Sequence, residues 1–124
     1  MAKQPAMPKA DPATAASFRA ALPNDARIAI RPMFGHTAAF VNGNMFAGTF
    51  GSDVFVRLPE AARSELLALE GARPFSPMKG RPMAEYVQLP PRRDAALAKA
   101  WFRRSLEWAA TLPPKAKARK KLRR

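Results

Sequence analysis

The stretch that decides the fold is IAIRPMFGHTAAFVNGNMFAGTFGSDVFVRL, residues 28–58. Apolar residues alternate there with polar or small ones in short runs, which is the period of a strand with one buried face. Asn42-Gly43 lies between two of these runs, and it is a strong hairpin signal because both central positions of a type I′ turn need a positive φ. Gly51-Ser52-Asp53 marks a further turn. The stretch therefore predicts an antiparallel meander, and Pro32 places its first strand at an edge or a bend.

Helical patterns flank the meander. Asp11-Pro12 predicts an N-cap and first residue of a helix that ends at Pro23. Pro59-Glu60 predicts the start of a second helix, which ends with Gly71 as its C′ residue. Its expected apolar face is Ala62, Leu66 and Leu69.

A third helix is predicted from Asp94 to about Leu112, with an aromatic-rich face that can cover a sheet. That face comprises Leu97, Trp101, Phe102, Leu106, Trp108, Ala109 and Leu112. On its polar side, Arg103 can pair with Glu107 at i,i+4. Another strand is expected over residues 83–89, and a short one over 74–78. The fold class is α+β, an antiparallel sheet packed by about three helices.

Composition limits the class of protein. The chain has 124 residues, the size of one domain, with 22 Lys and Arg against nine Asp and Glu. It has no cysteine and one histidine, which excludes disulfides and zinc sites built on Cys and fits a reducing cytosol. No apolar run approaches the ~20 residues of a membrane span, and residues 1–10 lack the apolar region of a secretory signal. We therefore expect a soluble cytoplasmic protein.

The net charge of +13 is the most unusual bulk property, and a field of this sign attracts nucleic acid, acidic proteins or anionic surfaces. Residues 115–124 read KAKARKKLRR and hold seven of these charges. We divide the chain into a flexible leader (1–10), a folded domain (11–112) and a disordered basic tail (113–124) that begins at Pro113-Pro114. The tail is either a solvated end or a sequence-independent nucleic-acid contact. Seven phosphate contacts would give a log–log salt slope of roughly −6. The tail has no aromatic residue on which bases could stack.

Basic residues in the domain could extend this surface, or could be scattered solubilising charge. The predicted nucleic-acid-binding set joins the tail to four arginines beside or on the last helix. It comprises Arg92, Arg93, Arg103, Arg104, Lys115, Lys117, Arg119, Lys120, Lys121, Arg123 and Arg124.

Catalytic machinery is not recognisable. His36 lacks a sequence pattern that supplies an orienting acid and a nucleophile, so a structural role is expected. Helix starts and turns explain several carboxylates, while Glu85 is the least explained and is either an exposed strand residue or a partner of Arg81. Neither a metal-ligand spacing nor a phosphate-binding glycine loop is present, so we predict no catalytic residue, no metal and no cofactor. The Met and Phe residues of 33–55 could form an adaptable binding surface, but core packing is the better explanation.

A family resemblance adds to these patterns. The segment RPMFG at 31–35, followed by FVNGNMFA at 40–47, resembles the opening of the N-terminal domain of TfoX/Sxy-type proteins. LPE at 58–60, PFSP at 74–77, GRPMAEY at 80–86 and the final helix from Trp101 to Pro114 follow in the same order. His36 departs from the pattern, where the family usually has a second glycine. The resemblance covers roughly residues 25–114, without the second domain of the full-length competence regulators.

The resemblance implies a curved antiparallel sheet packed by helices, and a link to the regulation of competence genes. It supplies no catalytic residue. Three functions remain open: a nucleic-acid-associated regulatory module, an adaptor that binds an acidic protein partner, and an unrecognised enzyme. The enzyme would need a pocket lined by His36, Glu85 or Tyr86.

Overall fold

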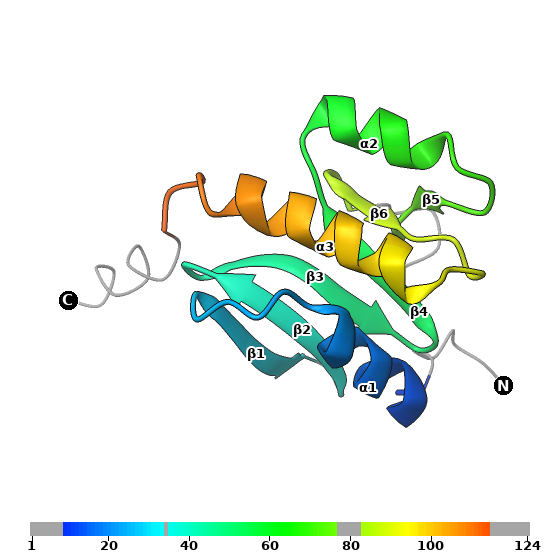
Figure 1. Cartoon of the computed structure of the whole chain (residues 1–124), viewed down its shortest axis with the longest axis horizontal. Helices are drawn as coiled ribbons and strands as arrows, with labels where there is room; N and C mark the ends of the chain where they lie inside the picture. Colours follow the sequence, from blue (N-terminus) through cyan, green and yellow to red (C-terminus); the bar gives the residue numbers. More distant parts are fainter. Residues whose placement is uncertain (1–8, 34, 77–82, 115–124) are drawn as a thin grey trace, which may run out of the picture.

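A computed structural model of the chain describes residues 9–33, 35–76 and 83–114. Its elements form an α+β domain with a curved sheet (Figure 1). In chain order they are α1 (Pro12–Ala21), β1 (Ile28–Met33), β2 (His36–Val41), β3 (Asn44–Phe50), β4 (Asp53–Arg57), α2 (Glu60–Leu67), β5 (Arg73–Pro74), β6 (Tyr86–Gln88) and α3 (Ala95–Ala109). All neighbouring strands are antiparallel, in the order β1-β2-β3-β4-β6-β5.

The predicted meander is confirmed. Asn42 and Gly43 have φ values of 52° and 82°, as the type I′ turn between β2 and β3 requires. The β2–β3 register shifts between Ala39 and Phe40, because Ala39 pairs with Ala47 while Phe40 pairs with Met45. This bulge leaves Phe46 as the extra residue, and its side chain is buried. β1 is the edge strand that Pro32 predicted.

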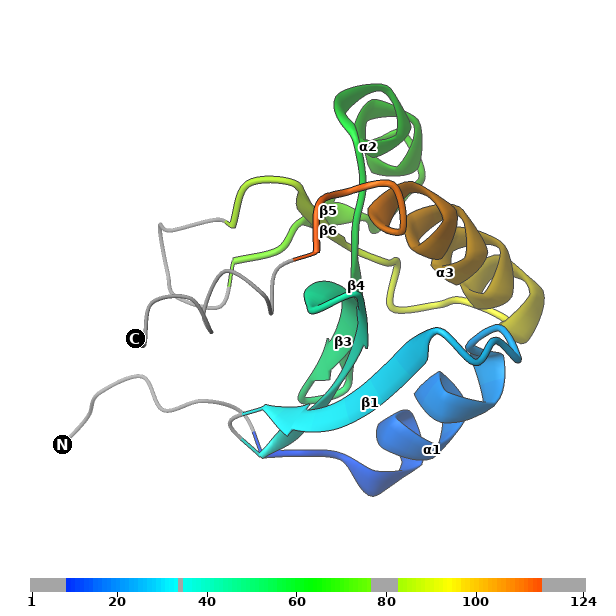
Figure 2. The same ribbon diagram turned by 90° about the vertical axis from the view of Figure 1, so that its left-hand side faces the viewer.

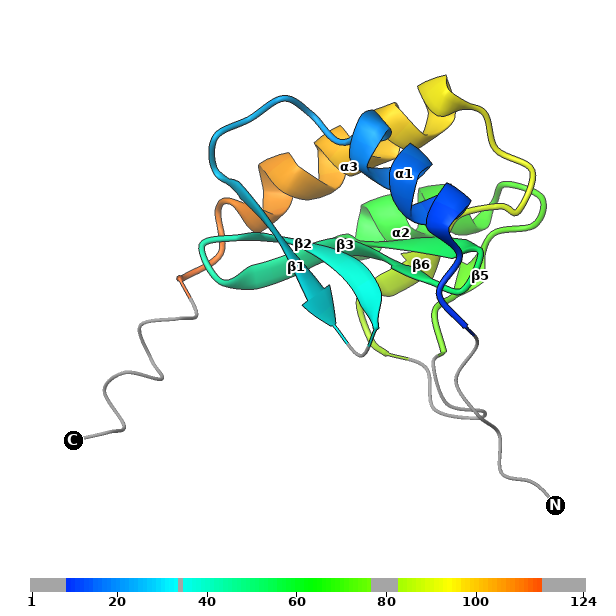
Figure 3. The same ribbon diagram turned by 90° about the horizontal axis from the view of Figure 1, so that it is seen from below.

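The three helices of the described residues lie on one side of the sheet (Figures 2 and 3). α3 packs along β3 and β4, and α1 packs against α3 where the Phe18 and Phe102 rings meet edge to face at 5.2 Å. The core between helices and sheet is almost wholly apolar. Its one buried α3 hydroxyl, that of Ser105, lies 2.7 Å from the Phe46 carbonyl and 2.6 Å from the Arg57 carbonyl. We call this side of the sheet the helix-covered face and the other side the helix-free face.

Several expected boundaries were wrong. α2 ends at Leu67, so Leu69 lies beyond it and is exposed instead of completing an apolar face. Gly71 is not the C′ residue of α2, whose C-cap is Ala68. Gly71 does have a positive φ of 93°, and an added Cβ would lie 3.2 Å from Pro91 Cδ, so glycine is needed there for a tight turn.

The last strand and helix are also shorter than predicted. β6 begins at Tyr86 and not at residue 83, because Glu85 has a φ of 75° and cannot continue a strand. α3 starts at the predicted cap, where Asp94 Oδ1 accepts a hydrogen bond from the Leu97 amide. It ends at Ala109, and Leu112 lies in a following turn. Arg103 and Glu107 are not among the ion pairs of the described residues.

Candidate functional site

The helix-free face carries a cluster of aromatic side chains. The Phe55 ring stacks on Phe75 at 4.1 Å, and Phe75 meets Phe50 edge to face at 5.5 Å. Tyr86 lies edge to face with Phe55 at 5.7 Å. Gly48, the cross-strand partner of Phe55, makes room for this cluster, because an added Cβ would lie 2.6 Å from Phe55 Cζ.

His36, the single histidine, belongs to this cluster. Its ring lies 5.1 Å from that of Phe50 and is buried. Its Nδ1 accepts a hydrogen bond of 3.3 Å from the amide of Gly51, at the turn that joins β3 to β4. The expected structural role is consistent with this geometry, since His36 joins the start of β2 to that turn.

A second set of side chains begins on the same face and ends at Trp108 of α3, and we call it the arginine–aromatic row. It comprises Arg31, Phe40, Met45, Arg57, Tyr86 and Trp108. Arg31 Cζ lies 4.7 Å from the centre of the Phe40 ring, and Phe40 pairs across the hairpin with Met45. All six side chains are half-buried or exposed, so this face offers π surfaces and guanidinium groups at the same place.

The far end of the row is held by Arg57 and Tyr86. Arg57 Cζ lies 5.8 Å from the Tyr86 ring centre and 5.5 Å from that of Trp108. The Tyr86 hydroxyl donates a hydrogen bond of 3.1 Å to the Met45 carbonyl. Burial raises the pKa of this hydroxyl, so it remains a neutral donor at neutral pH.

Glu85 is the one acidic residue found at the row. Its carboxylate accepts hydrogen bonds from the Arg57 guanidinium at 2.7 and 2.8 Å. Within the described residues Arg57 is therefore the partner of this carboxylate, whose side chain is 40% exposed; the predicted partner Arg81 lies outside those residues. Because Glu85 neutralises Arg57, the free positive charge of the row is that of Arg31.

One buried polar group near the aromatic cluster has no partner. Gln88 pairs across the sheet with Phe55 on one side and Arg73 on the other. Its Nε2 is buried and makes no hydrogen bond within the described part of the chain. Buried amide groups are nearly always hydrogen-bonded, so this donor is unusual. It is a polar group beside an otherwise aromatic region.

Net charge is unevenly divided along the chain. All nine acidic but only twelve of the 22 basic residues lie in the described part, which carries a net charge of +3. The other ten basic residues lie outside it: Lys3, Lys79, Arg81 and the seven of residues 115–124. The folded part alone is therefore a weak attractant for polyanions.

Described residues next to two of these basic segments are hydrogen-bonded to other parts of the fold. Asn44 Nδ2 donates a hydrogen bond of 3.0 Å to the Pro113 carbonyl, so the chain leaves the folded part beside Met45 of the row. The Met83 amide, which follows Lys79 and Arg81 in the sequence, donates a hydrogen bond of 2.8 Å to the Phe75 carbonyl. In Figure 2 the described chain on both sides of residues 77–82, and the chain after α3, extend toward the helix-free side.

The predicted arginines beside α3 do not form one cluster. Roughly ten helical residues, or ~15 Å, separate Arg92 and Arg93 from Arg103 and Arg104. Arg92 and Arg103 are exposed. Arg104 makes a bidentate ion pair with Glu65 at 2.9 and 3.0 Å and lies 4.5 Å over the Trp101 ring.

Arg93 is partly buried and donates to three backbone carbonyls, those of Pro90, Pro91 and Ser52. This burial lowers the pKa of its guanidinium. The seven predicted residues of the tail lie outside the described residues. Of the four domain arginines, Arg92 and Arg103 have guanidinium groups in none of the hydrogen bonds or ion pairs found in the described part.

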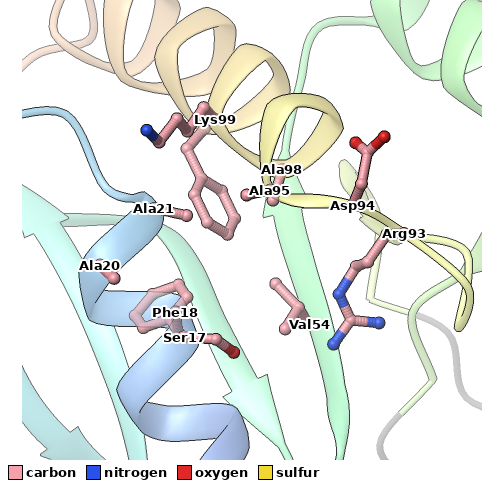
Figure 4. Close-up of a pocket in the computed structure, with 11 residues that line it drawn as sticks. Ser17, Phe18, Ala20, Ala21, Val54, Arg93, Asp94, Ala95, Ala98 and Lys99 are labelled. Atoms are coloured by element: carbon pink, nitrogen blue, oxygen red, sulfur yellow. The ribbon is translucent and has the colours of Figure 1, made fainter.

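A pocket of about 280 Å³ lies between α1 and the start of α3 (Figure 4). Phe18, Val54 and Ala98 contribute to an apolar floor, while Arg93 and Lys99 lie at its rim. Asp94 also lines it, but its carboxylate is engaged as the cap of α3. His36, Glu85 and Tyr86 do not line this pocket, so it is not the one that the enzyme hypothesis requires. Within the described ranges, no group of three or more Asp, Glu, His or Cys side chains could hold a metal ion.

Comparison with known proteins identifies the family. The family model of the TfoX N-terminal domain matches residues 18–109, which is most of the chain. The chain belongs to the TfoX N-terminal domain family. No curated protein and no solved structure matches it. The TfoX N-terminal domain is not a known enzyme family. No helix within residues 9–33, 35–76 and 83–114 combines the length and apolar character needed to span a bilayer.

Proposed function

We propose that this TfoX N-terminal domain protein is a non-enzymatic regulatory module of the cytoplasm that binds nucleic acid without sequence preference. Its family links it to competence regulation, and the binding residues we propose are the basic tail together with Arg92, Arg93, Arg103 and Arg104. Of the four domain arginines, Arg92 and Arg103 have guanidinium groups that make no hydrogen bond or ion pair within the described residues, and they should contribute more than Arg93 and Arg104.

The division of charge carries the proposal. A folded part of net charge +3 is joined to segments that hold ten uncompensated basic residues. Lys and Arg without acidic neighbours bind phosphates by displacing condensed counterions, which gives affinity without sequence information. Asn44 holds the start of the tail against the β2–β3 hairpin, so a polyanion on the tail would lie beside the folded part.

The experiment compares the full chain with a chain that ends at Pro114, which keeps the Asn44–Pro113 hydrogen bond. Binding to a labelled DNA duplex is measured by fluorescence anisotropy over a range of salt concentrations. The full chain should show a log–log salt slope near −6, and most of that slope should be lost on truncation. A matched control of full length, with the seven basic tail residues replaced by Gln, should behave like the truncated chain.

Absence of binding to DNA or RNA at the lowest ionic strength would exclude the proposed function. If the Gln variant kept a steep salt slope, the phosphate contacts would be assigned to the arginines of the domain and not to the tail. Capture of an acidic protein that survives nuclease treatment would instead support the adaptor function, which uses the same charges on a different partner.

A further inference from the structure

We infer that the arginine–aromatic row is a stacking surface for unpaired bases, so that the protein prefers single-stranded to double-stranded nucleic acid. This inference rests on the nucleic-acid binding proposed above, and it adds a second contact of different chemistry. Five members of the row, Arg31, Phe40, Met45, Arg57 and Tyr86, belong to strands of the sheet, and Trp108 of α3 meets Arg57 at the end of the row.

The first support is the kind of side chain on this face. A face that serves only stability buries its apolar side chains, as the helix-covered face does with Val41, Val56 and Val87. On the helix-free face, Phe40 and Tyr86 instead remain half-buried, each beside a guanidinium group. Aromatic rings and planar guanidinium groups are the side chains on which unpaired bases stack.

The second support is size. The row runs from β1 to β6, across four inter-strand spacings of about 4.8 Å, or roughly 19 Å. This is on the order of the width over which a four-stranded RNA-binding sheet stacks two or three bases. Met45 lies between Phe40, its cross-strand partner, and Tyr86, whose hydroxyl binds the Met45 carbonyl, so the surface is continuous.

The third support is the position of the charge. The tail supplies seven cations but no ring, whereas the row supplies rings and, after Glu85 neutralises Arg57, little charge beyond Arg31. Pro113, where the tail begins, is hydrogen-bonded to Asn44, the residue before Met45 of the row. A single strand could thus place phosphates on the tail and bases on the row. A duplex could use the basic residues but not the row, because its bases are already stacked and paired. An acidic peptide would likewise gain little from the row.

The test measures the affinity of the full chain for a short oligo-deoxythymidine strand and for a duplex of the same length. We expect the single strand to bind more tightly at the same salt concentration. Phe40→Leu keeps the apolar volume but removes the π face, and it should weaken single-strand binding roughly tenfold while leaving duplex binding unchanged. Leu67→Ala, an exposed change on α2, is the matched control and should change neither affinity. Circular dichroism verifies that each variant is folded.

Tryptophan fluorescence provides a second measurement. Trp108 lies at the end of the row, whereas Trp101 is buried beneath Arg104. The single strand should therefore quench fluorescence in the wild type but not in Trp108→Phe. Equal affinity for strand and duplex, with no loss in Phe40→Leu, would overturn this inference and leave the proposed function standing. Failure to bind either the single strand or the duplex would exclude both this inference and the proposed function.

Discussion

The two faces of the sheet have opposite characters. The helix-covered face is packed with buried Val, Leu, Ala and Phe side chains, and its one buried α3 hydroxyl is bound to carbonyls. The helix-free face has a buried aromatic cluster around Phe55 and half-exposed rings beside arginines, and the Gln88 amide has no hydrogen-bond partner among the residues that the structure describes. The helix-covered face and the buried aromatic cluster therefore stabilise the fold, whereas the half-exposed rings beside arginines have chemistry that stability does not require. Substitutions on the two faces can measure this difference.

The largest effect is expected from truncating an aromatic ring on the helix-covered side. Phe102→Ala removes a fully buried ring that packs against Phe18, and it should lower the free energy of unfolding by about 3–5 kcal/mol. Phe40→Ala is the matched change on the other face, where the ring is half-buried, and should cost less than about 1.5 kcal/mol. Urea unfolding of both variants measures the difference. Equal losses would mean that the two faces share the stabilising role.

A smaller loss of stability is expected from a substitution within the aromatic cluster. Gly48→Ala places a Cβ 2.6 Å from Phe55 Cζ and 3.2 Å from the Thr37 carbonyl oxygen, so the Phe55 ring must move and disturb its stack with Phe75. Such overpacking should destabilise the fold by about 1–3 kcal/mol. Gly48→Ala combined with Phe55→Leu should recover part of the loss, as thermal unfolding can measure. Failure of the double variant to recover would place the strain in the strand backbone and not in the ring.

A still smaller effect is expected at the buried hydroxyl of α3. Ser105 has one hydrogen and two carbonyls within 2.7 Å, so it satisfies one of them at a time. Ser105→Ala should therefore cost about 1–2 kcal/mol, mainly through an unpaired carbonyl. Ser64→Ala, at an exposed position on α2, is the control and should be neutral. A neutral Ser105→Ala would show that water can replace the hydroxyl.

Local chemistry explains what could be predicted from the sequence. The Asn42-Gly43 turn, the strand alternation and the Asp94 cap depend on residues a few positions apart, and all were confirmed. Pro32 correctly indicated an edge strand, because the missing amide of a proline is a local property. Boundaries failed where a distant contact intervenes. β6 is short because Glu85 turns out of the strand, and its carboxylate pairs with Arg57, 28 residues away in the sequence.

The candidate site was harder to predict because it is made across strands. The Phe40 and Met45 side chains were assigned to the core, since nothing in the sequence tells which face of the sheet lacks helices. Alternation does place Phe40 opposite in direction to Ala39 and Val41, so a two-faced sheet was visible in the pattern. The meeting of Tyr86 with Met45 depends on β6 lying beside β4, which no local pattern encodes. The arginines of α3 were predicted from charge alone, and Arg104 is paired with Glu65 on α2.

The smallest effect concerns acid pH at the surface of the helix-covered side. The Arg27 guanidinium holds the pKa of Asp25 at about 2, below its ordinary value of 3.8. A carboxylate with a depressed pKa stabilises the fold fully above its ordinary pKa, and the contribution is lost as the pH falls through the lower value. The difference in thermal stability between wild type and Asp25→Asn should thus shrink from about pH 4 to about pH 2, and should be small throughout because the pair is exposed. The difference in thermal stability between wild type and Glu65→Gln should likewise shrink as the pH falls, since Arg104 lowers the pKa of Glu65. A difference that does not vary with pH would assign these side chains a packing role, and the helix-covered side would then depend on its surface pairs as well as on its core.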